Sequence, residues 1–331
     1  MTSISNTGQE EDFIKLHQQR YIEDVLAAFD MTDANGVATP HILSVKLSKD
    51  HNAKSDEERE KMKDKPIRRL VGMLLFLARC TRPDIMTAVT TLARFQTDPG
   101  PMHWKWGKNI LKYIAGTRDL SIVYGKRNIK KDNHVQYVPL TVYHDSDWAG
   151  CADDRRSVTG WATLSFGGPI NWCSTKQKCC AQSSCEAEYI ASNEAAKESI
   201  WSIRLFKDLG YTAEDLHVAQ HSSKLCKESF NPAKYLREFP SEPEQAGATP
   251  LVQFCDNSAA ISNANNAGRF HKRMKHVEVR YHYVRNQVLA GNLKIAKVKT
   301  DDNVADILTK GIKREDFEKH RATLLDGTST K

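Results

Sequence analysis

The spacing of apolar residues changes once along the chain, from the helical period of about 3.6 to the two-residue period of strands. Four segments have the helical period: residues 18–29, 66–81, 84–96 and 102–116. Pro83 and the Asp98–Pro101 run separate the last three, and Gly116 fits a C-terminal helix cap. Residues 50–65 are dense in charge and predict a polar linker.

From residue 137 onward, apolar and polar residues alternate, which is typical of strands. The strands predicted in this way cover residues 137–145, 159–166, 170–174, 251–255 and 293–298. Gly167-Gly168 predicts a hairpin between the second and third strands. Helices are predicted over residues 186–209, around 258, over 276–289 and from 304 onward.

This order of elements, β-β-β-α-β-α-β-α, predicts an α/β fold in which helices cover a mixed sheet. We therefore divide the chain into a helical region over residues 1–135, a sheet domain over 136–312 and a tail over 313–331. Residues 212–249 have weak periodicity and predict a flexible insertion within the sheet domain.

Composition narrows the classes of function. The longest apolar run, Val71–Ala78, is far shorter than the roughly 20 residues of a membrane span, so we expect no membrane partner. The eight cysteines form no C-x-x-C pair, and we interpret them as reduced thiols in an intracellular protein.

The net charge is +7, and residues 265–299 hold nine basic residues against Glu278 alone. That excess predicts a nucleic-acid partner.

Four acidic residues fall at predicted strand ends or first helical turns: Asp145, Glu188, Asp256 and Asp306. Carboxylates from separate elements can form an oxygen-ligand site for divalent cations. Glu186 competes with Glu188, but Ser183 and Glu186 have capping-box spacing, which leaves Glu188 free. Asp145 and Asp147 lie on the same face of their strand, so alternation does not separate them.

Five ordered motifs then resemble one family. They are HDSDWAGCADDRRSVTGW (144–161), SSCEAEYIA (183–191), FCDNSAA (254–260), KRMKHVEVRYHYVR (272–285) and ADILTK (305–310). Together they resemble the ribonuclease H domain of copia-type LTR-retrotransposon Pol polyproteins. Residues 68–89 and 103–124 resemble the thumb or connection region of reverse transcriptase in the same polyproteins. The resemblance implies a ribonuclease H-like fold for 136–312 and a carboxy-terminal part of a longer polyprotein.

The resemblance also implies an activity. This family cuts the RNA strand of RNA–DNA hybrids with two Mg²⁺ ions, for which Mn²⁺ can substitute. Its catalytic and metal-binding carboxylates fall on Asp145, Glu188, Asp256 and Asp306. Asp145 would bridge both ions, with Glu188 and Asp256 on one side and Asp306 on the other. We therefore expect an endonuclease, a hydrolase acting in a cytoplasmic particle or in the nucleus.

Two departures from the family pattern affect this expectation. The histidine that often precedes the last aspartate is absent, and residues 296–299 read Ala-Lys-Val-Lys instead. The paired polymerase aspartates are also absent, because Tyr21-Ile22-Glu23-Asp24 is not a Y-V-D-D motif. We therefore expect no polymerase activity from this chain alone, and we expect the missing polymerase palm region to be a partner.

Basic and polar residues near the acidic motifs are candidates for binding nucleic acid. They are Arg155, Arg156, Asn257, Ser258, Lys272, Arg273, Lys275 and Arg280. Asn257 and Ser258 would contact the 2′-hydroxyls that distinguish RNA from DNA. Two other functions compete with the nuclease: a catalytically idle fragment that only binds nucleic acid, and integrase-type strand transfer. An aspartate rather than a glutamate at position 306 argues against strand transfer.

Overall fold

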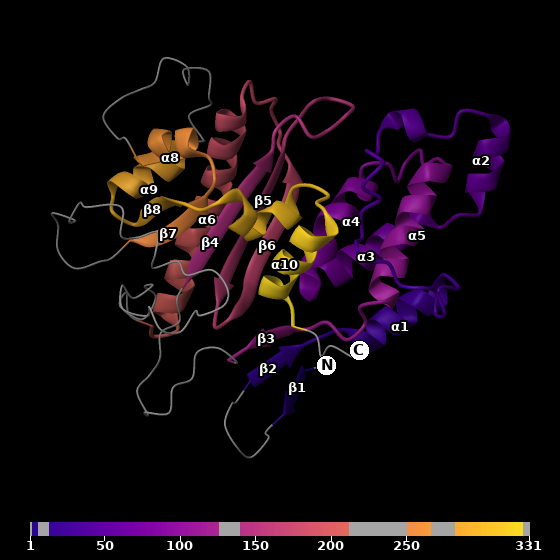
Figure 1. Cartoon of the computed structure of the whole chain (residues 1–331), viewed down its shortest axis with the longest axis horizontal. Helices are drawn as coiled ribbons and strands as arrows, with labels where there is room; N and C mark the ends of the chain where they lie inside the picture. The colour runs from indigo at the N-terminus through magenta and orange to yellow at the C-terminus, as the bar shows by residue number, and fades with distance from the viewer. Residues whose placement is uncertain (1, 6–12, 126–139, 212–249, 266–281, 327–331) are drawn as a thin grey trace.

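The computed structural model describes residues 2–5, 13–125, 140–211, 250–265 and 282–326. Its centre is a five-stranded mixed sheet with helices on both faces (Figure 1). The strands, in the order in which they pair, are β6 (Gly168–Lys176), β5 (Val158–Ser165), β4 (Thr141–Asp147), β7 (Leu251–Cys255) and β8 (Leu293–Lys297). The predicted mixed α/β sheet is confirmed.

The strand directions bring two chain segments to one edge of the sheet. β4 pairs with β5 antiparallel but with β7 parallel, with Val142 opposite Gln253 and Tyr143 opposite Phe254. β7 in turn pairs with β8 in parallel. The carboxyl ends of β4 and β7 therefore lie side by side, and the residues that follow or end these strands share one edge. β4 continues to Asp147, two residues beyond the predicted strand end at Asp145.

The predicted hairpin between β5 and β6 is confirmed, with its turn at Phe166 and Gly167 rather than at two glycines. Both turn residues have positive φ, 54° and 88°. A two-residue hairpin with this backbone matches the twist of the flanking strands. Gly168 is instead the first residue of β6.

One face of the sheet is covered by α6 (Ser184–Asp208), α8 (Ser258–Asn265) and α9 (Tyr283–Leu289) (Figure 1). α6 begins where Ser183 Oγ accepts a hydrogen bond from the Glu186 amide. It ends at Gly210, whose φ of +89° suits only glycine without strain. Both ends agree with the helix predicted from its apolar spacing. The part of the predicted 276–289 helix before residue 282 lies outside the described residues.

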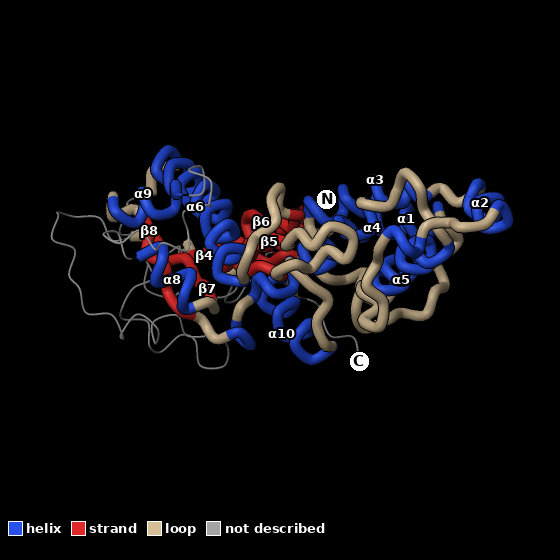
Figure 2. The backbone as a smooth tube through the Cα atoms, turned by 90° about the horizontal axis from the view of Figure 1, so that it is seen from above, coloured by secondary structure: helices blue, strands red, loops and turns tan. Residues whose placement is uncertain are grey.

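The opposite face packs against the helices of the first half of the chain. These are α1 (Gln19–Ala28), α3 (Ile67–Cys80), α4 (Met86–Ala93) and α5 (Pro101–Ala115). The later elements η7 (Val304–Leu308), a 3₁₀ helix, and α10 (Arg314–Leu324) share the same hydrophobic core. Direct hydrogen bonds join the two parts of the chain: Trp172 Nε1 donates to the Ala78 carbonyl at 2.8 Å, and Thr87 Oγ1 to the Ile307 carbonyl at 2.9 Å. Figure 2 shows this helical region beside the sheet.

Several segments have more structure than their sequence predicts. The expected linker contains the 3₁₀ turn η1 (Lys49–His51) and α2 (Asp56–Lys63), because Ser55 caps a helix with an acidic first turn and a basic last turn. Strand β3 (Ile122–Tyr124) pairs with β2 (Phe13–Leu16), and β2 pairs with β1 (Thr2–Ser5). Such short strands give little periodic signal.

The end of the sheet region also differs from the prediction. The helix expected from residue 304 is the short η7 followed by α10, and α10 occupies part of the expected 313–331 tail. Phe317 and Leu324 of α10 are buried in the core, which explains why this segment is ordered. Residues 126–139, which hold the predicted boundary, and the insertion at 212–249 lie outside the described residues. No helix in the described residues has the length and apolarity to cross a membrane.

A buried ion pair fixes the helical region. Between α3 and α4, at the 3₁₀ turn η2 (Pro83–Ile85), the Arg82 guanidinium donates to both Asp84 carboxylate oxygens, at 2.9 and 2.7 Å, and both side chains are fully buried. Tyr113 of α5 donates to the same carboxylate at 2.6 Å. Arg82 also donates to the Thr117 carbonyl and hydroxyl beyond α5. The pair therefore joins the turn after α3 to α5.

We expect Arg82→Met to destabilise the protein by about 3–5 kcal/mol, because it leaves the Asp84 carboxylate buried without its cation. Urea unfolding measures this change. Arg79→Met, at an exposed position of α3, is the matched control and should change stability by less than about 0.5 kcal/mol. Equal losses of unfolding free energy in the two variants would show that the buried ion pair does not account for the effect of Arg82→Met.

Candidate functional site

Three of the predicted carboxylates meet at the carboxyl ends of β4 and β7. Asp145 is on β4, Asp256 follows β7 directly, and Asp306 lies in η7. One carboxylate oxygen from each lies within 4.8 Å of those of the other two. Asp145 and Asp306 are buried and Asp256 is half-buried. Residues 111 and 50 positions apart in the sequence are thus brought to one point by the parallel pairing of β4 with β7 and by the return of the chain in η7.

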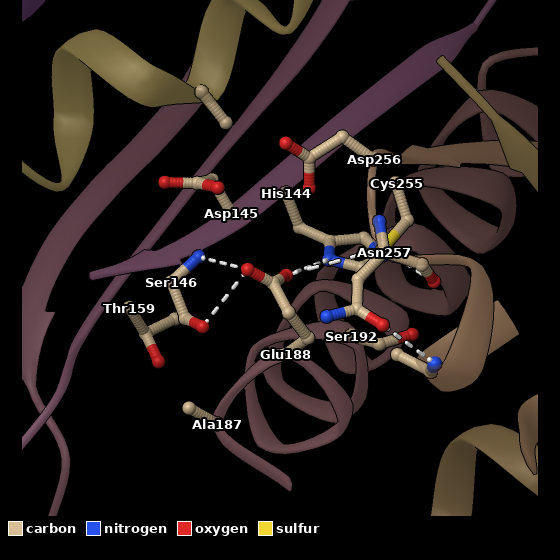
Figure 3. Close-up of polar contacts among 12 residues, drawn as sticks. His144, Asp145, Ser146, Thr159, Ala187, Glu188, Ser192, Cys255, Asp256 and Asn257 are labelled. Atoms are coloured by element: carbon tan, nitrogen blue, oxygen red, sulfur yellow. Dashed lines mark hydrogen bonds and ion pairs between the residues drawn. The ribbon is translucent and has the colours of Figure 1, made fainter. Parts of the chain in front are cut away.

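The fourth carboxylate, Glu188 of α6, lies next to this group without being part of it (Figure 3). Its Oε1 accepts hydrogen bonds from the Ser146 amide and from Ser146 Oγ, both at 2.9 Å. Its Oε2 is 3.8 Å from His144 Nδ1 and 3.9 Å from Cys255 Sγ. One oxygen of Glu188 is therefore held by Ser146 of β4, and the other faces His144 of β4 and Cys255 of β7.

Crowding and burial shift the protonation of these carboxyls. Burial, with the nearby Asp145 charge, raises the pKa of Asp306 to about 8. Burial, with the charges of Asp145 and Asp256, also raises the pKa of Glu188 well above its usual value. These directions are those expected when several like charges share a site of low polarity. The site consequently favours either protons or added positive charge.

The cation Lys310 lies at the carboxylate group. Its Nζ is 3.2 Å from Asp306 Oδ1 and 3.8 Å from Asp145 Oδ2, and these charges raise the lysine pKa against the effect of burial. Thr309 Oγ1 donates to Asp145 Oδ2. Sequence reasoning missed both roles, although both residues belong to the ADILTK motif. A lysine four residues after an acid is the local signal that could have identified Lys310.

The segment in place of the family histidine contacts Asp256. Lys297 Nζ donates to the Asp256 carbonyl, and Thr300 Oγ1 donates to Asp256 Oδ2 at 2.9 Å. The lysine of this pair comes from β8, and the hydroxyl comes from the turn that follows β8. Both contacts orient Asp256, and neither was predicted.

The two ambiguities in the acidic pairs are resolved by position. Asp147 is not in the carboxylate group: its Oδ2 lies against the backbone of Gly150, 2.0 Å from where a Cβ there would stand. Glu186 uses its carboxylate at the start of α6, where Oε2 accepts from the Gln182 amide at 2.8 Å. Asp145 therefore lies in the carboxylate group and Glu188 beside it, whereas Asp147 lies against Gly150 and Glu186 accepts a hydrogen bond at the start of α6.

The predicted nucleic-acid contacts are only partly described. Arg155 is exposed and has a φ of 56°, whereas Arg156 Nε is 3.7 Å from Asp154 Oδ2 within the same loop. Ser258 is exposed, but Asn257 Oδ1 accepts from the amides of residues 259 and 260, which leaves its Nδ2 for other contacts. The remaining candidates, Lys272, Arg273, Lys275 and Arg280, lie outside the described residues.

The raised pKa of Asp306 predicts a pH dependence of stability without divalent metal. Between about pH 6.5 and 8 the unfolded carboxyl is already ionised, while the folded one must still lose its proton. The contribution of Asp306 to the free energy of unfolding should therefore fall as pH rises through this window, by up to about 1.4 kcal/mol per pH unit. Asp306→Asn should reduce this slope.

Urea unfolding at several pH values in the presence of a chelator measures the effect. The buried histidines stay neutral in the folded chain, because burial lowers the pKa of His144 to about 3 and that of His41 to about 4. Their imidazoles still titrate near pH 6.5 in the unfolded chain, but this contribution is the same in the wild type and in Asp306→Asn and cancels in the difference between their slopes. Asp316→Asn, on the exposed face of α10, is the matched control. If the slope of unfolding free energy against pH is the same in the wild type and in Asp306→Asn, then Asp306 does not hold a proton in this pH range.

Comparison with known proteins identifies the family. The chain is similar to the retrovirus-related Pol polyprotein from transposon TNT 1-94 of Nicotiana tabacum, with 37% identity over 303 residues, which are 92% of this chain and 19% of that protein. Its identity to the Pol polyproteins from transposons RE2 and RE1 of Arabidopsis thaliana is 34% and 35% over 305 residues, again 92% of this chain and 18% and 17% of theirs.

The chain thus spans less than a fifth of the length of these curated relatives. No family model matches it, and no solved structure does. The matched residues, 92% of this chain, include both the helical region and the sheet region. The chain therefore belongs to the retrovirus-related Pol polyproteins of transposons, the family that its ordered copia-type motifs predict.

Proposed function

We propose that this chain hydrolyses the RNA strand of RNA–DNA hybrids. The observation that carries the proposal is the meeting of Asp145, Asp256 and Asp306 at one edge of the sheet, with Glu188 beside them. These are the four positions that the family resemblance assigns to catalysis. An arrangement in which every member is an oxygen donor suits hydrolysis of a phosphodiester better than chemistry that needs a nucleophilic side chain.

The sheet topology supports a ribonuclease H-like fold for residues 136–312. Three strands in antiparallel succession, β4, β5 and β6, are followed along the chain by a long helix and then by two strands parallel to β4. This is the order that the resemblance implies. The proposal applies to this region, and the helical elements before it would support the sheet from one face.

The carboxylates also fit the metal that the family uses. Mg²⁺ prefers oxygen ligands, and burial together with the neighbouring carboxylates raises the pKa values of Asp306 and Glu188, as expected where acidic groups are crowded. Asp145, Glu188, Asp256 and Asp306 would hold the ions. Bound Mg²⁺ would lower the pKa of a water ligand and stabilise charge on the leaving oxygen.

The residues around the carboxylates would prepare the site for its substrate. Ser146, Thr300 and Thr309 hold individual carboxylate oxygens in place by hydrogen bonds. Lys310 would neutralise part of the acidic charge before metal binds and would then turn towards a substrate phosphate. Arg155, exposed on the loop after β4, would contact a phosphate further along the hybrid.

Cleavage of a labelled RNA–DNA hybrid in Mg²⁺ tests the proposal. We expect cuts only in the RNA strand of the hybrid, with none in single-stranded RNA, duplex RNA or duplex DNA. Asp256→Asn should lower the rate at least about 100-fold, because it removes one charged oxygen donor from the site. The products should carry 3′-hydroxyl and 5′-phosphate ends.

Asp316→Asn is the matched control, since it removes an exposed carboxylate from α10 and should retain the rate. Circular dichroism and hybrid binding would be measured for every variant. Binding without cleavage by the folded wild-type chain would refute the nuclease and favour the idle, nucleic-acid-binding alternative. Joining of DNA strands would instead indicate strand transfer.

The proposed contact between Arg155 and a phosphate of the hybrid gives a separate prediction for binding. Arg155→Ala should weaken hybrid binding a few-fold and reduce the slope of log K against log salt by about 1, as expected for one lost phosphate contact. Fluorescence anisotropy at several salt concentrations measures both. Arg59→Ala removes a comparably exposed arginine from α2 and is the control. An unchanged slope in Arg155→Ala would exclude this contact.

A further inference from the structure

A second group of ligand-type side chains lies directly behind the carboxylates. His144 of β4, Cys255 of β7 and Glu188 of α6 each offer one atom within 4.8 Å of the other two. All three residues are buried, with 0%, 0% and 4% of their surface exposed. They bring together a nitrogen, a sulfur and an oxygen, in contrast to the all-oxygen group beside them (Figure 3).

The sheet register explains why these residues meet. β4 and β7 are parallel, with Val142 opposite Gln253, so positions 144 and 255 continue the same row two residues further. Side chains alternate along a strand, so His144 and Cys255 share the sheet face covered by α6, and Asp145 and Asp256 share the other. Glu188 reaches this row from the first turns of α6.

The distances between the donor atoms suit a small four-coordinate ion. Glu188 Oε2 is 3.8 Å from His144 Nδ1 and 3.9 Å from Cys255 Sγ. Ligand atoms bound tetrahedrally at about 2.0–2.3 Å lie about 3.5 Å apart, so the two distances from Glu188 need to shorten by only a few tenths of an ångström. His144 and Cys255 offer atoms within 4.8 Å of each other and would draw together around the ion, and a water would be the fourth ligand.

The donors are already oriented by their neighbours. Glu188 Oε1 is held by Ser146, which directs Oε2 towards the group. The Asn257 amide donates to Cys255 Sγ at 3.3 Å, a contact that stabilises negative charge on the sulfur. His144 is the exception: neither of its ring nitrogens has a hydrogen-bond partner among the described residues, although the ring is fully buried. A buried imidazole normally satisfies at least one nitrogen.

We propose that His144, Cys255 and Glu188 bind a Zn²⁺ ion at this position. Imidazole, thiolate and carboxylate are the ligands that Zn²⁺ takes, whereas Mg²⁺ selects oxygen ligands. Binding would release the thiol proton to solvent. The thiolate and carboxylate would then balance the two positive charges of the ion, so the buried site would be neutral. The ion would also give the His144 ring the partner that it lacks.

Such a site would compete with the proposed nuclease. Glu188 has one oxygen held by Ser146 and one directed towards His144 and Cys255, so an ion in the N/S/O group engages the oxygen that remains. Zn²⁺ would thereby withdraw Glu188 from the Mg²⁺ site and inhibit cleavage. This consequence rests on the proposed function, whereas binding of the ion does not.

Titration of the full chain with Co²⁺, a spectroscopic substitute for Zn²⁺, tests the site under reducing conditions. We expect a thiolate-to-cobalt charge-transfer band that saturates at one ion per chain, together with intense visible bands of four-coordinate Co²⁺. Excess Zn²⁺ should abolish these bands, and excess Mg²⁺ should not. Cys255→Ser should lose the charge-transfer band, while Cys173→Ser, on β6 away from the group, should keep it.

Zn²⁺ X-ray absorption on the wild-type chain gives a second measurement that does not depend on a variant folding. We expect one sulfur neighbour together with nitrogen and oxygen neighbours. Shells of nitrogen and oxygen alone, absence of the cobalt band in the wild type, or a band that persists in folded Cys255→Ser would each overturn the proposal. None of these readouts depends on hybrid cleavage, so they remain decisive if the chain is not a nuclease.

Discussion

Repulsion among buried carboxylates is the constraint on which the rest of this structure depends. Asp145, Asp256 and Asp306 have carboxylate oxygens within 4.8 Å of one another, Asp145 and Asp306 are buried, and the raised pKa of Asp306 reflects the cost of this arrangement. The fold must therefore supply stability elsewhere and compensate locally. It does so with Lys310 and with hydroxyls that donate to individual oxygens. The parallel β4–β7 pair makes the approach unavoidable, since both strands end at the same edge.

The sequence predicts elements whose signal is local. β5, β7 and α6 follow from alternation, from helical spacing and from caps at Ser183 and Gly210, all of which act within a few residues. Short strands such as β3 carry too few positions for a period, and their existence depends on partners more than a hundred residues away. The Arg82–Asp84 pair is similar: two charges separated by Pro83 suggest an exposed turn, and their burial depends on contacts with α5, which lies later in the chain.

The same distinction between local signals and long-range contacts applies to the residues of the candidate site. The four carboxylates were predicted, but the choice of Asp145 over Asp147 came from the family resemblance, because both lie on one face of β4. What separates them in the structure is the turn beyond β4, where Asp147 packs on the backbone of Gly150. Lys310 escaped prediction for the opposite reason. Its sequence position beside Asp306 is an ordinary helical pair, and only the approach of β4 makes it the cation of a three-carboxylate group.

Glu188 connects the two donor groups and limits what the site can do. A carboxylate has two oxygens, and Ser146 occupies one of them with two hydrogen bonds. The other faces an imidazole and a thiol on one side, while the repulsion that raises the Glu188 pKa comes from Asp145 and Asp256 on the other. If both proposed sites bind their ions, hard and soft cations would compete for the same carboxylate from opposite faces of the sheet.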